Sequence, residues 1–139
     1  MSEPRFEVTP VGTVESPLTD LAAAPKQGDE GAPDAGLVFD ASVLDALDGI
    51  GAGDELGVLT WLDRARRDVL RVHPRGDPSR PERGVFSTRS PHRPNPVGLH
   101  VVEVVSIDGL RVRVRNLEAV DGTPVIDVKA VLSSDIGRR

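Results

Sequence analysis

Short stretches in which apolar and polar residues alternate recur along most of the chain, and this spacing of two predicts β-strands. The first stretch contains Pro10, which removes a backbone donor and therefore places that strand at a sheet edge or a bulge. Asp108-Gly109 separates two later stretches and indicates a β-hairpin. The expected strands are Phe6–Glu15, Leu37–Phe39, Glu55–Leu62, Asp68–Val72, Leu99–Ile107, Leu110–Leu117 and Val125–Leu132, with a short one at Val85 and Phe86.

One segment, Ala41–Leu47, has helical spacing, because its apolar residues fall on one face and Asp40 or Ser42 can cap its start. The glycine-rich stretch DGIGAGD (48–54) follows it directly. A cofactor-binding glycine loop would follow a strand and precede a helix, so we interpret this stretch as a helix-terminating turn with Gly49 near the C′ position. The apolar face consists of Val43, Leu44 and Leu47.

These elements together predict a mainly β protein, namely a small, mostly antiparallel single-sheet β-barrel with one short helix. With 139 residues the chain is long enough for one hydrophobic core, so we expect a single domain over residues 1–139 with its core at about 6–132. It contains neither a membrane-spanning apolar run nor a signal peptide, and we expect a cytoplasmic protein without membrane attachment.

The net charge of −5 conceals an asymmetry, because residues 1–60 carry −10 and residues 61–139 carry +5. Nine arginines lie between Arg64 and Arg93. Both a solvated arginine-rich surface and an RNA-binding surface are compatible with this charge. The same two interpretations apply to Arg111, Arg113 and Arg115, which alternate with valines and therefore project from one face of a strand.

Metal and nucleophile chemistry have little support in the sequence. Without cysteine there is no disulfide or thiolate, and His73, His92 and His100 lack the spacing of metal ligands, so we predict no metal site. His100 is expected to be an ordinary strand residue. No GxSxG motif indicates a serine hydrolase.

The stretch GVFSTRSPHRPNPVG (84–98) has no generic structural explanation. Its three prolines exclude a helix or a central strand, so it must be a stiff loop. Arg89, His92 and Arg93 lie on this loop and form a preorganised set of donors for a ligand with carboxylate or phosphate groups.

Four segments taken together resemble the TrmO family, also called TsaA-like. They are VGTVESP (11–17), PKQGDEGAP (25–33), the stiff loop 84–98 and VDGTPVIDVK (120–129). The resemblance implies a β-barrel enzyme that uses S-adenosylmethionine to methylate N6 of the threonylcarbamoyl-modified adenosine beside the anticodon of certain tRNAs. It further implies a homodimer with the cofactor near the subunit interface, and this chain is similar to the short form without a C-terminal extension.

Carried over position by position, the resemblance implies sites for cofactor and substrate. We hypothesise that Asp121 or Asp127 accepts a hydrogen bond from the adenine N6 amine, and that His92 and Arg93 contact the substrate. Glu118-Ala119, Ala130-Val131 and Asp63 depart from the family pattern. The implied cofactor-binding residues are Pro25, Lys26, Gln27, Asp63, Arg64, Arg89, Leu99, Leu117, Glu118 and Asp121.

Two alternatives to the tRNA methyltransferase stay open at this point. One is a methyltransferase of the same fold that acts on a small molecule, which the acidic isoelectric point of about 5.1 favours. The other is a non-catalytic module that binds S-adenosylmethionine or RNA.

Overall fold

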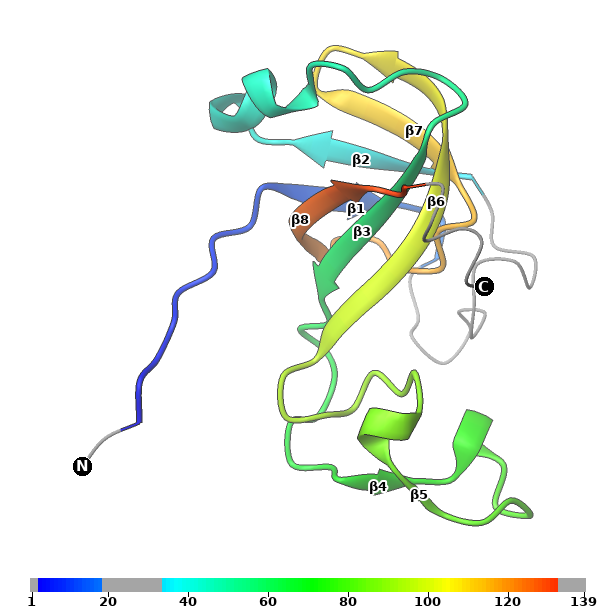
Figure 1. Ribbon diagram of the computed structural model, residues 1–139. Helices are drawn as coiled ribbons and strands as arrows, with labels where there is room; N and C mark the ends of the chain where they lie inside the picture. The colour runs from blue at the N-terminus through cyan, green and yellow to red at the C-terminus, as the bar shows by residue number, and fades with distance from the viewer. Residues whose placement is uncertain (1–2, 19–33, 133–139) are drawn as a thin grey trace.

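The computed structural model describes residues 3–18 and 34–132, and its main feature is a closed barrel of six antiparallel strands in the order β1-β2-β7-β6-β3-β8 (Figure 1). A separate two-stranded sheet, β4-β5, lies beyond one end of the barrel. This confirms the predicted fold class. The barrel strands are β1 (Gly12–Glu15), β2 (Ala35–Phe39), β3 (Glu55–Trp61), β6 (Val97–Asp108), β7 (Arg111–Arg115) and β8 (Pro124–Ala130).

The barrel closes because β1 pairs on one side with β2 and on the other with β8. Side chains of alternate residues point inward and form one apolar core, as expected for a small closed sheet. Valine dominates this core, and its β-branched side chain suits both the strands and the narrow interior. The fully buried members include Leu37, Leu117, Val14, Val58, Val102, Val112, Val114 and Val125.

Strand β7 shows how the alternating pattern becomes two faces. Its valines are buried, and its three arginines project outward, where each is paired with an acid on a neighbouring segment. The N–O distances are 2.7 Å for Arg111–Glu15, 3.7 Å for Arg113–Asp34 and 3.2 Å for Arg115–Glu103. This is the arrangement of a solvated outer face, and it leaves none of the three arginines without an acidic partner.

The predicted β6–β7 hairpin is confirmed, with its turn one residue later than the Asp-Gly pair suggests. Asp108 still pairs with Arg111, so Gly109 and Leu110 form the two-residue turn. Gly109 has φ +60°, the left-handed value that a type II′ hairpin requires at its first turn position.

The first predicted strand is too long at its start, because β1 begins at Gly12 and not at Phe6. Residues 3–10 run away from the barrel (Figure 1), and the side chain of Phe6 is 88% exposed. Pro10 explains the difference, since it lacks the donor needed to continue the ladder. The pairing starts only beyond it, with Val11 donating to the carbonyl of Val125 at 2.7 Å.

The predicted helix is present as a 3₁₀ helix, η3 (Ala41–Leu47). Asp40 caps it by accepting a hydrogen bond from the Ser42 amide at 3.4 Å. Only part of the predicted apolar face is buried, because Val43 and Leu47 pack against the core and Leu44 is exposed. Asp48 is the C-cap of η3, and Gly49 follows it with φ +93°, which confirms the helix-terminating turn.

Residues 62–96 form an excursion between β3 and β6 that we call the arm (Figure 1). The strand predicted at Asp68–Val72 is reduced to β4 (Arg71–Val72), which pairs with β5 (Arg83–Gly84). Val85 and Phe86 are not a strand: the Val85 amide still donates to the Leu70 carbonyl at 2.9 Å, but the backbone turns there into the 3₁₀ helix η5 (Val85–Ser87). A second 3₁₀ turn, η4 (Pro74–Gly76), lies between β4 and β5. Within the described ranges, no helix has the length and apolar composition needed to cross a membrane.

Leu37 is fully buried, so a substitution there tests the hydrophobic core assigned to the barrel. We expect Leu37→Ala to lower the free energy of unfolding by about 2–5 kcal/mol, because the fully buried side chain leaves a cavity. Leu44→Ala on η3 is the matched control and should cost less than about 1 kcal/mol, because Leu44 is half exposed. Urea denaturation followed by circular dichroism measures both, and equal losses would contradict the assigned core.

Candidate functional site

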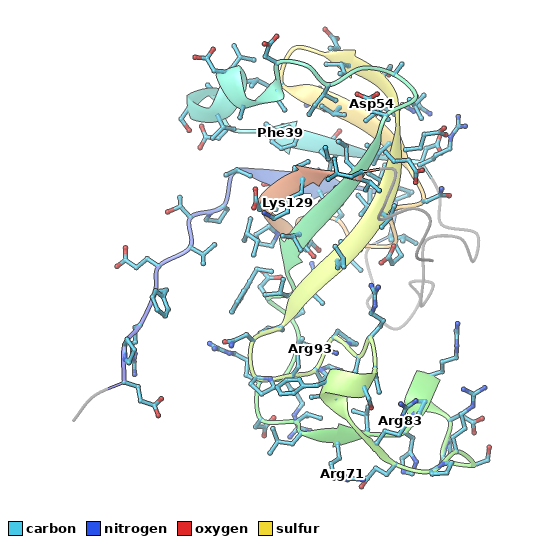
Figure 2. The ribbon with its side chains drawn as sticks, viewed as in Figure 1. Phe39, Asp54, Arg71, Arg83, Arg93 and Lys129 are labelled. Atoms are coloured by element: carbon cyan, nitrogen blue, oxygen red, sulfur yellow. The ribbon has the colours of Figure 1, made fainter. Side chains whose placement is uncertain are left out.

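The proline-rich loop at the barrel end of the arm is organised by the guanidinium of Arg93. Its Nε donates to the carbonyl of Ser90 at 2.8 Å, and its Nη2 donates to the carbonyls of Val85 at 2.9 Å and Thr88 at 2.7 Å. Prolines supply no amide donors, so carbonyls in such a loop need other partners. Figure 2 shows Arg93 between the barrel and the β4–β5 hairpin, where its guanidinium can donate to all three carbonyls.

A second set of contacts ties the turn after β3 to the same loop. The Arg66 amide donates to Nδ1 of His92 at 2.9 Å, and the Arg93 amide donates to the Arg66 carbonyl at 3.1 Å. Arg67 donates to the Pro94 carbonyl and lies over the Trp61 ring, 5.3 Å from its centroid. The arm is therefore held rigidly where it leaves β3 and returns to β6.

Farther along the arm, several arginines are paired with acids. Arg71 contacts Glu82 at 3.1 Å, and Arg80 lies 3.8 Å from Asp77. The hydrogen bond from Arg66 lowers the pKa of the Asp68 carboxyl, and Asp68 in turn raises the pKa of Arg66. Hydrogen bonds from Ser79 lower the pKa of Asp77 in the same way. These pairs are exposed and compensate part of the positive charge of the arm.

A chain of three polar side chains lies at the end of the barrel core nearest the arm. His100 on β6 is 95% buried, its Nε2 is 2.7 Å from Oγ1 of the fully buried Thr60 on β3, and its Nδ1 is 2.5 Å from Oε1 of Glu118. A glutamate oxygen accepts, so Nδ1 carries the proton in this contact. The Glu118 side chain is only 17% exposed.

Gly98 makes room for this chain of contacts. It pairs with Thr60 across β3 and β6, and a Cβ at position 98 would lie 2.5 Å from Thr60 Oγ1 and 2.7 Å from His100 Nε2. Real Cβ atoms do not approach other heavy atoms so closely, so any other residue would displace the imidazole. The glycine that ends the proline-rich loop is therefore required by the packing of His100.

Arg89 and Glu118, two residues expected to bind the cofactor, are brought together through β6. Nη1 of Arg89 donates to the carbonyl of Leu99 at 3.3 Å, and the next residue, His100, contacts Glu118. Leu99 itself is half exposed on the outer face of β6, and Leu117 is fully buried beside Glu118. Arg89 and Glu118 thus contact adjacent residues of β6, Leu99 and His100.

The two candidate catalytic acids lie in different places. Asp121, three residues after Glu118, accepts from the Ser16 amide at 2.9 Å, and its own amide donates to the Leu18 carbonyl. Asp127 lies on β8 opposite Leu59 and accepts from the amide of Val128. It lines a separate hollow of about 530 Å³ beside η3, away from Arg89.

The remaining predicted site residues lie in the arm or outside the described part of the chain. His92 and Arg93 use ring and guanidinium atoms inside the arm, as described above, and Asp63 and Arg64 are exposed in the turn after β3. Pro25, Lys26 and Gln27 lie outside the described residues. Across residues 3–18 and 34–132, no three His, Cys, Asp or Glu side chains come together in a way that could hold a metal ion.

Sequence reasoning missed Thr60 and His100. The interpretation of His100 as an ordinary strand residue is wrong, because the ring is buried and bonded at both nitrogens. One signal was available: His100 shares the parity of the buried positions Val102 and Val104, so a polar residue there must find a partner inside the barrel.

Comparison with known proteins finds a matching family model and several relatives of similar sequence. The family model described as the tRNA-methyltransferase O N-terminal domain matches residues 13–135. A probable S-adenosyl-L-methionine-binding protein of Methanothermobacter thermautotrophicus is 47% identical over 129 residues, covering 93% of this chain and 92% of the relative. An S-adenosyl-L-methionine-binding protein of Archaeoglobus fulgidus is 45% identical, covering 86% of this chain and 85% of the relative.

Solved structures agree with the sequence comparison. A crystal structure of TrmO from Pseudomonas aeruginosa matches with a TM-score of 0.75 and 26% identity, covering 94% of this chain. The chain spans only 58% of that structure's length. The resemblance drawn from the four sequence segments is therefore confirmed, and the chain belongs to the family of the tRNA-methyltransferase O N-terminal domain.

Proposed function

We propose that the protein is an S-adenosylmethionine-dependent methyltransferase that acts on tRNA, at N6 of the threonylcarbamoyl-modified adenosine beside the anticodon. Family membership and the names of the relatives support the cofactor and the transfer of a methyl group. The observation that carries the proposal is the convergence of Arg89 and Glu118 at one end of the barrel, on neighbouring residues of β6.

The residues at this end fit the cofactor chemically. A guanidinium has five donors, and Arg89 uses one of them on the Leu99 carbonyl, which leaves donors for a carboxylate. Glu118 uses Oε1 on His100 and no second hydrogen bond of its carboxylate is found among the described residues, so Oε2 can accept from ribose hydroxyls. When bound, the cofactor supplies an electrophilic methyl group on a sulfonium.

The protein's own contribution to transfer is mainly positioning, because an adenine N6 amine is a weak nucleophile that must be aligned with the methyl–sulfur bond. A carboxylate that accepts the N6 hydrogen bond would fix this alignment. Of the two candidate acids, Asp121 lies three residues from Glu118 and Asp127 lies beside η3, so the geometry favours Asp121. Its Oδ1 is occupied by the Ser16 amide, which orients the carboxylate.

The arm provides a surface for the phosphate backbone of tRNA, and the protein would act as a cytoplasmic homodimer, as the family resemblance implies. Arg83 is exposed on β5, and none of the ion pairs of the described residues includes it (Figure 2). Phosphate contact therefore depends on fewer arginines than the sequence suggests, because Arg66, Arg71 and Arg80 are paired with acids.

Cofactor affinity tests the role of Arg89. We expect Arg89→Ala to weaken binding of S-adenosylmethionine about 10- to 100-fold, because charge-assisted hydrogen bonds to a carboxylate are lost. Arg83→Ala, which removes the same charge elsewhere on the arm, should change affinity less than about twofold. Isothermal titration calorimetry measures both, and an unchanged affinity for Arg89→Ala would remove Arg89 from the cofactor site.

Methyl transfer tests the proposed substrate. With labelled S-adenosylmethionine, the protein should methylate tRNA that carries the threonylcarbamoyl group and leave tRNA without it unlabelled. Label in small molecules of a cell extract instead of tRNA would favour the small-molecule enzyme, and cofactor binding without transfer would favour a binding module. Asp121→Asn and Asp127→Asn separate the two acids: the one that slows transfer while keeping cofactor affinity marks the N6 acceptor.

Salt dependence tests the surface used for tRNA. Each phosphate contact contributes a slope of about −0.7 to −0.9 to the logarithm of affinity against the logarithm of salt concentration, so Arg83→Ala should reduce the magnitude of the slope by about 1. Arg115→Ala, on the outer face of the barrel and paired with Glu103, should leave the slope unchanged. Filter binding at several salt concentrations measures the slopes, and a flat response of the unmodified protein would exclude the arm as the tRNA surface.

A further inference from the structure

The contact between His100 and Glu118 is unusual for this barrel, whose interior is otherwise filled mainly with valine and leucine. Burying an imidazole and most of a carboxylate costs desolvation that apolar side chains of similar size avoid. The hydrogen bonds to Thr60 and Glu118 offset that cost, but they do not make the protein more stable than an apolar core would. A polar chain at this position therefore points to a use beyond stability.

Three features hold the imidazole in one orientation. Thr60 fixes Nε2, the ring lies against Gly98 where no Cβ would fit, and the β3–β6 pairing holds both strands on either side. Glu118, by contrast, lies outside the strands, in the connection between β7 and β8. Its carboxylate is thus oriented by a rigid partner and not by its own backbone.

We propose that His100 is a positioning residue for the cofactor site, which holds Oε1 of Glu118 so that Oε2 faces the ligand's ribose hydroxyls. The inference rests on the proposed function, since Glu118 must be a cofactor ligand for it to hold. A free glutamate has three rotatable side-chain bonds and loses that freedom on binding. His100 restrains the Glu118 carboxylate before the ligand binds. Binding therefore costs less side-chain conformational entropy, and the affinity is higher.

Two variants of His100 each remove one of its two hydrogen bonds, to Thr60 or to Glu118. The amide nitrogen of asparagine lies near the position of Nδ1, so His100→Asn keeps a donor to Glu118 and loses the Thr60 contact. The longer glutamine reaches the position of Nε2, so His100→Gln keeps the Thr60 contact and loses the donor to Glu118. We expect His100→Gln to weaken S-adenosylmethionine binding about tenfold and His100→Asn to weaken it less than about threefold, measured by calorimetry.

The double variant separates positioning from packing. In a Glu118→Ala background, His100→Gln should cause no further loss of affinity, because His100 acts only through Glu118. Urea denaturation of each variant shows how far stability changes, and a packing role would make affinity follow stability in both backgrounds. Equal losses for the two His100 variants, or a loss by His100→Gln that persists without Glu118, would overturn the inference.

The same experiment distinguishes this inference from the function on which it rests. If the unmodified protein binds no S-adenosylmethionine, the proposed function fails. If the unmodified protein binds the cofactor and Glu118→Ala binds it equally well, the proposed function stands and the positioning role of His100 is wrong.

Discussion

The pairing of β3 with β6 is the constraint on which the rest of this structure depends. Seven residue pairs, from Glu55 opposite Glu103 to Trp61 opposite Val97, set one register. A shift by one residue would turn every side chain of β6 to the other face, so His100 would leave the interior and an outward residue would replace it. The arm begins after the last residue of β3, Trp61, and ends before the first residue of β6, Val97, which is paired with Trp61.

The stiffness of the proline-rich loop has a different origin from the one its prolines suggest. Prolines restrict the backbone and remove donors, but they leave carbonyls that need partners. Arg93 supplies donors to three of these carbonyls, and His92 accepts from the turn after β3. Arg93 and His92, which resemble ligand-binding groups in the sequence, therefore form hydrogen bonds that build the loop, whereas Arg89 donates to the Leu99 carbonyl of β6.

The fold was predictable because its signals are local: alternation in β7, the Gly109 turn and the cap at Asp40 depend on neighbouring residues. The cofactor-site residues, which stay a prediction, came only from resemblance to a family. The contact between His100 and Glu118 joins residues 18 positions apart, and alternation reveals that position 100 faces inward without naming its partner. The first strand is shorter than predicted because Pro10 lacks an amide donor, and the strand predicted at Val85 is replaced by the 3₁₀ helix η5.

The geometry of the site follows from the rigidity of β6. Arg89 contacts the carbonyl of Leu99, and Glu118 contacts the ring of His100, so the two proposed cofactor-binding side chains contact adjacent residues of one strand. A strand advances about 3.3 Å per residue and deforms little, whereas the arm and the β7–β8 connection are irregular. The separation of guanidinium and carboxylate is therefore set by the barrel. Differences in length or sequence within the arm can alter the arginine-rich surface proposed to contact tRNA without moving these two groups apart.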